Sequence, residues 1–290
     1  MDKISIDKMK KSEKISFYVP VFNSGAYLEK CLLSIASQEY PVFEIIVIDN
    51  CSTDNSMEIA ASLKKRGVNL RIIKENKPGL ANARNNALEN AKGDFIASID
   101  ADCIIEKDWL SSAMKNFNEK SVAGVGGKLV ENSRWRAVHL KQEWGNKRII
   151  NPPFLFGANT VFRTEALKSI GGYNARFSSN YEDVDISKRL ISNNFKLVYE
   201  PRAIAHHMKK EGLFSLLKNV WAWGFYGNEP KSISDSAKRI VFNVKRPFEL
   251  LADDLMNKRH AFLLIDFIIF FSNPFFDLKY YLLRLKKQYF

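Results

Sequence analysis

Apolar and polar residues alternate along the first hundred positions in a pattern that predicts short buried strands separated by helices. Apolar, β-branched runs predict strands at 15–19, where Pro20 follows, and at 44–48, 69–74 and 95–99. Between them, apolar residues recur at helical spacing over 27–35, 55–66 and 79–91. Strands that alternate with helices of this length predict a parallel sheet with right-handed crossovers, and therefore an α/β fold.

The pattern is less regular after position 103. It predicts strands at 122–130, 154–162 and 195–199, the last ended by Pro201, and helices at 182–191 and 213–225. We therefore expect a flexible N-terminus (1–14), a strand–helix half (15–103), a second half of the same domain (104–210) and a helical C-terminal appendage (211–290).

Two carboxylates follow the strand predicted at 95–99. Asp100 and Asp102 are two positions apart, and in an extended chain such residues project from the same side. Hard oxygen ligands at this spacing suit a divalent cation that is shared with the phosphates of a substrate. Ligands of parallel sheets bind beyond the carboxyl ends of the strands. The polar clusters at 20–23, 49–54 and 100–102 should therefore meet in space.

The amino-acid composition limits the class of protein to which this chain can belong. The 290 residues are 46% hydrophobic and 26% charged, as in a globular protein, and carry a net charge of +12. Such a charge indicates either an anionic partner, such as a nucleic acid, an anionic membrane or a phosphorylated substrate, or only a solvated basic surface. Cys31, Cys51 and Cys103 show no paired ligand spacing, which argues against a disulfide framework or a zinc site and indicates a reducing compartment.

Taken together in their order, the motifs of this chain resemble those of the family 2 glycosyltransferases, which have the GT-A fold. The resemblance runs from about 15 to 227 and rests on residues 19–23, Ser34 with Gln38, 44–54, 79–85, Asp100 with Asp102, 157–159 with 162–163, 171–173, 182–185 and a histidine after Pro201. It implies a Rossmann-like, mostly parallel central sheet flanked by helices. It also implies a nucleotide-sugar donor of the UDP or GDP type, bound by the half at 15–103.

The resemblance assigns roles to the clustered polar residues. It implies that the nucleotide sugar is held by Pro20, Val21, Asn23, Asp49, Arg84, Asp100 and Asn159. It implies that Asp102 binds Mg²⁺ or Mn²⁺, helped by a histidine, for which His207 fits better than the adjacent His206. Gly126 and Gly127 are expected to let the backbone approach the sugar.

An acidic pair is implied near the acceptor. An inverting transfer needs a base on the face of the sugar opposite the leaving nucleotide, and Asp183 is the residue expected to fill that role. Glu182 would hold the acceptor hydroxyl or orient Asp183, and Asp185 would face away. Two roles remain open for the tryptophans of this region, which are stacking on an acceptor sugar and packing in the core. The residues are Trp135, Trp144, Trp221 and Trp223.

The C-terminal region combines basic residues with aromatic ones. The apolar run at 261–271 is too short to cross a bilayer, and the N-terminus does not look like a secretion signal. Two alternatives remain open for the C-terminal helices. They lie on the cytoplasmic surface of an anionic membrane, where a lipid-linked acceptor would be found, or they pack on the core or on a second subunit.

The sequence therefore predicts a cytoplasmic, metal-dependent, inverting glycosyltransferase with a glycan or lipid-linked acceptor, acting in the synthesis of a surface polysaccharide or glycolipid. A sugar nucleotidyltransferase is the first alternative, but it should carry a Gly-rich basic loop after the first strand, where this chain has Pro20 to Asn23. A basic nucleic-acid-binding protein is the second. It is disfavoured because acidic residues occupy the predicted strand ends and would repel phosphates.

Overall fold

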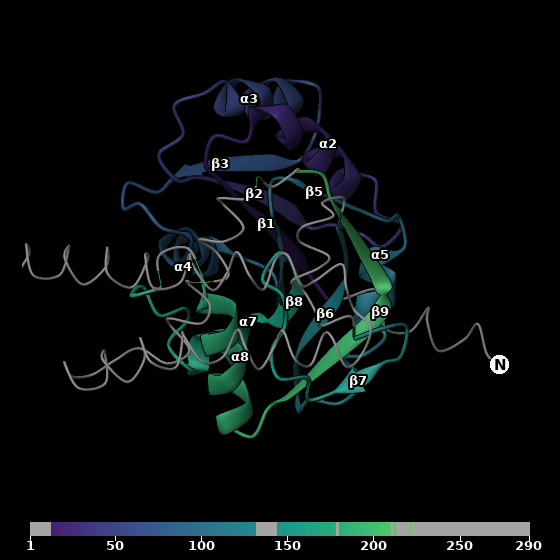
Figure 1. Ribbon diagram of the computed structural model, residues 1–290. Coiled ribbons are helices and arrows are strands. Elements are labelled where there is room, and N and C mark those ends of the chain that lie inside the picture. Colours follow the sequence, from purple (N-terminus) through teal and green to yellow (C-terminus); the bar gives the residue numbers. More distant parts are fainter. Residues whose placement is uncertain (1–12, 132–143, 178–179, 210–211, 213–220, 222–290) are drawn as a thin grey trace, which may run out of the picture. The chain divides into compact units, whose positions relative to one another are not determined.

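A computed structural model describes residues 13–131, 144–177, 180–209, 212 and 221 of the chain (Figure 1). The predictions for Trp135, Trp223, the helix at 213–225 and the apolar run at 261–271 lie outside these residues. Within the described part, nine strands form one sheet in the order β3-β2-β1-β4-β8-β6-β9-β5, with β7 paired to β9. No helix in that part combines the length and the hydrophobicity that crossing a bilayer requires.

The first half is the parallel α/β unit that the alternation predicts. Its elements are β1 (Ile15–Val21), α2 (Gly25–Ala36), β2 (Glu44–Asp49), α3 (Ser56–Lys65), β3 (Leu70–Lys74), α4 (Leu80–Asn90) and β4 (Phe95–Ile99). β1 pairs in parallel with both β2 and β4, and β2 pairs in parallel with β3. All four carboxyl ends therefore lie at one edge of this part of the sheet.

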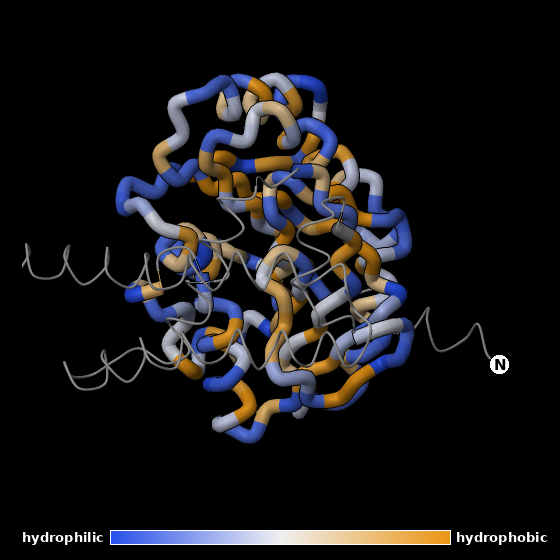
Figure 2. The backbone as a smooth tube through the Cα atoms, in the orientation of Figure 1, coloured by the Kyte–Doolittle hydropathy of each residue, from blue (hydrophilic) through white to orange (hydrophobic). Residues whose placement is uncertain are grey.

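Burial on both faces explains the continuous apolar runs of these strands. Phe17 and Val47 pack in the core that includes buried residues of α2 and α3, whereas Tyr18 and Ile46 pack in the core that includes α4. Successive residues of a strand point to opposite faces, so neighbours in sequence serve different cores. Figure 2 shows the hydrophobic segments along the strands and hydrophilic ones over the outer loops.

The second half extends the sheet with mixed pairing. Its elements are β5 (Cys103–Ile105), α5 (Trp109–Met114), β6 (Val122–Glu131), β7 (Ile149–Ile150), β8 (Asn159–Arg163), α7 (Thr164–Ser169), α8 (Glu182–Ser192) and β9 (Lys196–His207). β8 is antiparallel to β4 and to β6, whereas β6 and β9 are parallel. β5, which closely follows β4 in the chain, pairs antiparallel with β9. The end of β9 therefore lies beside the residues that follow β4.

Two prolines do not end their strands, contrary to the prediction. Pro20 lies inside β1, but β4 pairs with β1 only as far as Tyr18, so a residue without an N–H is tolerated there. Pro201 lies inside β9 at a register shift, where the pairing with β6 jumps from Glu200 to Ile204. A bulge leaves residues out of the ladder and accommodates proline. The strand predicted at 154–162 begins only at Asn159.

Candidate active site

A pocket of about 380 Å³ lies at the carboxyl end of β1, beside the start of α4. Its lining is mainly apolar and consists of Pro20, Val21, Phe22, Asn50, Pro78, Gly79, Leu80 and Ala83. Asn50 fixes one wall, because its Oδ1 accepts a hydrogen bond from the Gly79 N–H (2.9 Å) and its Nδ2 donates to the Lys77 carbonyl (2.8 Å). Sequence reasoning missed Asn50 as a site residue. Its position directly after β2 was the available signal.

The turns beside the pocket are built by two residues that were expected to touch the nucleotide. Asn23 adopts a left-handed backbone (φ 49°), and its Oδ1 accepts from the Thr53 N–H at 2.8 Å. Asp49 accepts from the Ser52 N–H at 2.9 Å through Oδ1. Both side chains therefore stabilise the loops that follow β1 and β2, while Pro20 and Val21 line the pocket itself.

Arg84 is the buried electrostatic centre of the site. Its side chain is only 1% exposed. The guanidinium donates to the Gly157 carbonyl (2.8 Å) and the Tyr18 hydroxyl (3.1 Å). It also pairs with Asp100 at 3.4 Å through Nη2 and with Glu182 at 3.5 Å through Nε. The Arg84 side chain, carried by α4, is thus the shared cationic partner of two carboxylates, Asp100 and Glu182, that lie far apart in the sequence.

The acidic pair at the start of α8 is buried. Asp183 accepts hydrogen bonds from the Gly157 N–H (3.2 Å) and the Val184 N–H (2.8 Å). Burial raises the pKa of Asp183 above its ordinary value. Burial, followed by the neighbouring Asp183 charge, raises the pKa of Glu182 to about 8, against the opposing effect of Arg84. Both groups therefore hold a proton more readily than exposed carboxylates do.

Backbone groups of residues 157–158 connect this acidic pair with the end of β4. Gly157 donates to Asp183 and accepts from Arg84, while the Ala158 carbonyl accepts from the Asp100 N–H at 3.4 Å. The structure therefore brings Asp100, Glu182 and Asp183 into one cluster, as the motifs predict. A Cβ at position 157 would lie 2.6 Å from the Arg84 guanidinium, so a side chain there would displace the guanidinium from this position.

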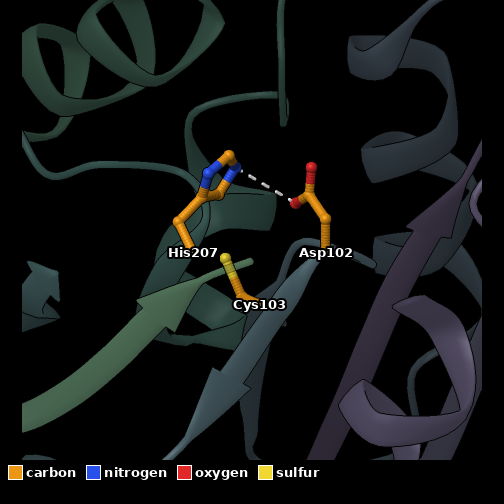
Figure 3. A group of neighbouring side chains, drawn as sticks. All are labelled: Asp102, Cys103 and His207. Atoms are coloured by element: carbon orange, nitrogen blue, oxygen red, sulfur yellow. Dashed lines mark ion pairs between the residues drawn. The ribbon is translucent and has the colours of Figure 1, made fainter. Parts of the chain in front are cut away.

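A possible metal-binding group lies just beyond Asp100. Ligand atoms of Asp102, Cys103 and His207 all lie within 4.8 Å of one another, and Figure 3 shows the three side chains directed toward a common space. Asp102 Oδ1 is 3.3 Å from His207 Nε2. The neighbouring His206 points elsewhere and contacts Glu106 at 2.7 Å. Of the two histidines, His207 therefore faces Asp102, as the spacing from Pro201 favours.

Asn159 lies in the interior and is not brought to the pocket. Its Oδ1 accepts from the Trp109 indole N–H at 2.6 Å, and its Nδ2 donates to the Lys128 carbonyl at 2.9 Å. The amide therefore links α5 to β6. Gly126 and Gly127 also have structural reasons to be glycine, since added Cβ atoms would collide with Leu155 and with the Ala203 carbonyl, respectively.

Of the tryptophans, Trp144 belongs to an aromatic cluster. Its ring lies 5.1 Å from that of Tyr199, 5.6 Å from Phe154 and 5.7 Å from Phe156, measured between centroids. Tyr199 and Phe154 are buried, so the cluster anchors the segment before β8 to β9. This arrangement favours packing over stacking on a sugar for Trp144.

Comparison with known proteins identifies the fold and the family. The family model described as Glycosyl transferase family 2 matches residues 16–171, and that of Glycosyl transferase family group 2 matches residues 95–284. TarS, a poly(ribitol-phosphate) beta-N-acetylglucosaminyltransferase of Staphylococcus aureus (strain Mu50 / ATCC 700699), is 29% identical over 211 residues, which cover 69% of this chain and 36% of that protein. The poly-beta-1,6-N-acetyl-D-glucosamine synthase of Staphylococcus epidermidis is 28% identical over 231 residues, covering 75% of this chain and 55% of that protein. The chain thus spans between about a third and about half of these relatives.

Solved structures agree with the fold. The crystal structure of S. aureus TarS residues 1–349 in complex with UDP-GlcNAc is similar with a TM-score of 0.57 and 25% identity, over 69% of this chain and 59% of that chain. The mannosyltransferase PcManGT from Pyrobaculum calidifontis, in complex with GDP-Man and Mn²⁺, has a TM-score of 0.66 and 17% identity, over 95% and 93%. These similarities confirm the GT-A fold that the motifs predict.

Proposed function

The chain belongs to glycosyl transferase family 2, and we propose on that basis that it transfers a sugar from a nucleotide-sugar donor to a hydroxyl of a glycan or lipid-linked glycan. The observation that carries the proposal is the Arg84-centred cluster. One buried cation holds Asp100, at the end of a strand of the nucleotide half, and Glu182, in the acidic pair of the second half. Family membership favours this function over a nucleotidyltransferase or a nucleic-acid-binding protein.

The pocket at the end of β1 is the proposed site for the nucleoside. Its apolar walls, with Pro20 and Phe22 on one segment and Pro78 and Leu80 on another, suit the faces of a planar base. TarS and PcManGT are described in complexes with UDP-GlcNAc and GDP-Man, respectively, which supports a UDP- or GDP-linked donor. Asp100, part exposed beside Arg84, would then lie nearest the ribose.

Asp102 and His207 would hold the divalent cation. The Asp102 carboxylate suits Mn²⁺ or Mg²⁺, and the His207 nitrogen, 3.3 Å away, adds a ligand suited to Mn²⁺; Asp102 remains 19% exposed, so an ion has access from one side. A bound cation neutralises charge that builds on the leaving diphosphate. Arg84 is buried and engaged, so it would act by holding Asp100 in place rather than by contacting phosphate.

Asp183 is the proposed general base of an inverting reaction. Its carboxylate is fixed by two backbone N–H groups, and burial makes it a stronger base than an exposed aspartate. It would accept the proton of the acceptor hydroxyl as that oxygen attacks the anomeric carbon. Glu182 would bind the same hydroxyl, since among the described residues its buried Oε2 makes no hydrogen bond.

Three variants test these roles. We expect Asp183→Asn to keep metal-dependent binding of the donor and to lose transfer, because the amide cannot accept the proton. Asp185→Asn is the matched control, since Asp185 lies on the same helix and pairs with Arg189 at 2.8 Å, away from Asp183. Asp102→Ala should lose both donor binding and transfer.

The assay has two readouts. A panel of UDP-, GDP- and dTDP-sugars is screened for Mn²⁺-dependent thermal stabilisation, and transfer is then followed with the donor that binds. Near-normal turnover by Asp183→Asn would remove the base assignment. Failure of every donor to stabilise the protein would remove the proposed function. His206→Ala serves as the control for His207→Ala, because only His207 faces Asp102.

The positive charge of the chain, +12 overall, also supports a place at an anionic membrane surface on the cytoplasmic side, where a lipid-linked acceptor would be available. A pelleting assay with anionic vesicles, comparing the full chain with a form that ends near residue 231, tests this part. Equal binding of the two forms would assign the C-terminal residues another role.

A further inference from the structure

We propose that Cys103 is a third side-chain ligand of the cation site, so that the chain binds a thiophilic divalent cation of the Zn²⁺ or Co²⁺ class through oxygen, nitrogen and sulfur. The inference rests on the proposed function only in that it uses the same Asp102 and His207. It adds a ligand and a metal preference that the acidic motif does not imply. Paired cysteine spacing is absent from the sequence, so only the fold reveals this group.

The strand pairing places the three side chains together. Cys103 begins β5 and lies directly opposite His207 at the end of β9 in an antiparallel ladder, and Asp102 precedes Cys103. Residues opposite each other in such a ladder project their side chains on the same face. The Met208 N–H donates to the Asp102 carbonyl at 2.8 Å, which ties the two chain segments together beyond the last paired residues.

The distances already approach those of a coordination sphere. Two ligand atoms about 2.1 Å from a tetrahedral ion lie about 3.4 Å apart. Asp102 Oδ1 and His207 Nε2 are 3.3 Å apart, and all three ligand atoms, including the Cys103 sulfur, lie within 4.8 Å of one another. The sulfur therefore lies close to the space that an ion held by Asp102 and His207 would occupy.

The three side chains differ in their exposure to solvent. The Asp102 side chain is 19% exposed and that of His207 is 5% exposed, whereas Cys103 is fully buried. An ion would enter past the carboxylate and meet the sulfur last. The thiol, which is shielded from solvent reagents, is placed to act as a ligand rather than as an exposed reactive cysteine.

The chemical type of the ligand atoms determines which divalent cation the site prefers. Mg²⁺ selects oxygen ligands, whereas Zn²⁺ and Co²⁺ also accept imidazole and thiolate. On coordination the Cys103 thiol releases its proton to solvent, and the resulting thiolate binds the metal. Sulfur ligation should therefore strengthen the binding of Zn²⁺ and Co²⁺ while leaving the binding of Mg²⁺ and Mn²⁺ almost unchanged.

The test uses the metal-free full chain titrated with Co²⁺ alone, without nucleotide. A Co²⁺–thiolate bond gives a charge-transfer absorption in the near ultraviolet. We expect this band in the wild type and in Cys51→Ser, whose thiol lies near the Glu75 carbonyl, and we expect its loss in Cys103→Ser. In competition titrations, Cys103→Ser should weaken Zn²⁺ binding by at least about tenfold and Mn²⁺ binding by less than about twofold.

Two outcomes overturn the proposal. One is a wild-type Co²⁺ complex without a thiolate band, which is decisive even if Cys103→Ser fails to fold. The other is a band that survives in Cys103→Ser and disappears in Cys31→Ser, because Cys31 is the second buried cysteine near this site, donating to the Asp100 carbonyl at 3.5 Å.

The test also separates this inference from the proposed function. A missing band with intact Mn²⁺-dependent donor binding rejects only the cysteine ligand. A clear band in a chain that transfers no sugar rejects only the glycosyltransferase proposal.

Discussion

Replacing Arg84 by methionine should destabilise the whole fold, because one buried guanidinium serves carboxylates from separate parts of the chain. Methionine keeps much of the volume and removes the charge. The variant leaves Asp100 and Glu182 without their cation and the Gly157 carbonyl without its donor. Glu182 and the Gly157 carbonyl are buried, so water cannot replace the Arg84 guanidinium as their partner.

The magnitude follows from the geometry. At pH 9, above the Glu182 pKa of about 8, this carboxyl is ionised, and at an effective dielectric constant of about 20 two unit charges at the 3.5 Å separation of Arg84 and Glu182 attract by about 5 kcal/mol. Removing one partner of a buried pair typically costs about 3–5 kcal/mol, because the other charge stays buried. We expect a loss of this size, which is a large part of the total stability of about 5–15 kcal/mol that is usual for a native protein.

Arg66→Met is the matched control. Arg66 pairs with Glu29 at 2.8 Å, closer than any Arg84 ion pair, but its side chain is 58% exposed. Exposed pairs contribute at most about 1 kcal/mol, so this variant should unfold almost as the wild type does. Urea unfolding at pH 9, followed by far-ultraviolet circular dichroism, measures both changes in the free energy of unfolding.

A double variant identifies the cause of the loss. Glu182→Gln added to Arg84→Met removes the carboxylate that has lost its partner, and it should recover at least about 1 kcal/mol. The reasoning is refuted if Arg84→Met costs no more than Arg66→Met. It is also refuted if the double variant is less stable than Arg84→Met.

Two further predictions concern stability. Because burial and Asp183 raise the pKa of Glu182 from about 4.3 in the unfolded chain to about 8, the native state binds more protons between these values, and its stability should fall as pH rises through this range. Glu182→Gln should flatten that fall in urea midpoints taken from pH 5 to 8.5, and parallel pH curves would contradict the assignment. Gly127→Ala should destabilise the fold by about 1–3 kcal/mol, because its Cβ would collide with the Ala203 carbonyl beside Asn159. An unchanged melting temperature would show that the backbone there has room for a side chain.

Local patterns were sufficient for the elements whose signal lies within a few residues. The strands β1, β2 and β4 were visible as apolar runs because both of their faces are buried, and α8 was visible from its periodic apolar positions. The prolines misled the prediction. Whether Pro20 or Pro201 interrupts a strand depends on which neighbour pairs there, and pairing partners are distant in sequence.

The candidate active site was likewise predictable in part from the sequence and in part only from the tertiary structure. The ordered motifs were enough to predict the family and the grouping of Asp100 with the acidic pair. The sequence alone could not decide that Arg84 is buried and that Asn159 faces the interior, since burial depends on packing between segments far apart in the chain. Nor could it reveal that Cys103 lies opposite His207, because antiparallel pairing joins positions about a hundred residues apart. Composition and periodicity fix which residues can pack or bind, whereas the register of the sheet decides which of them meet.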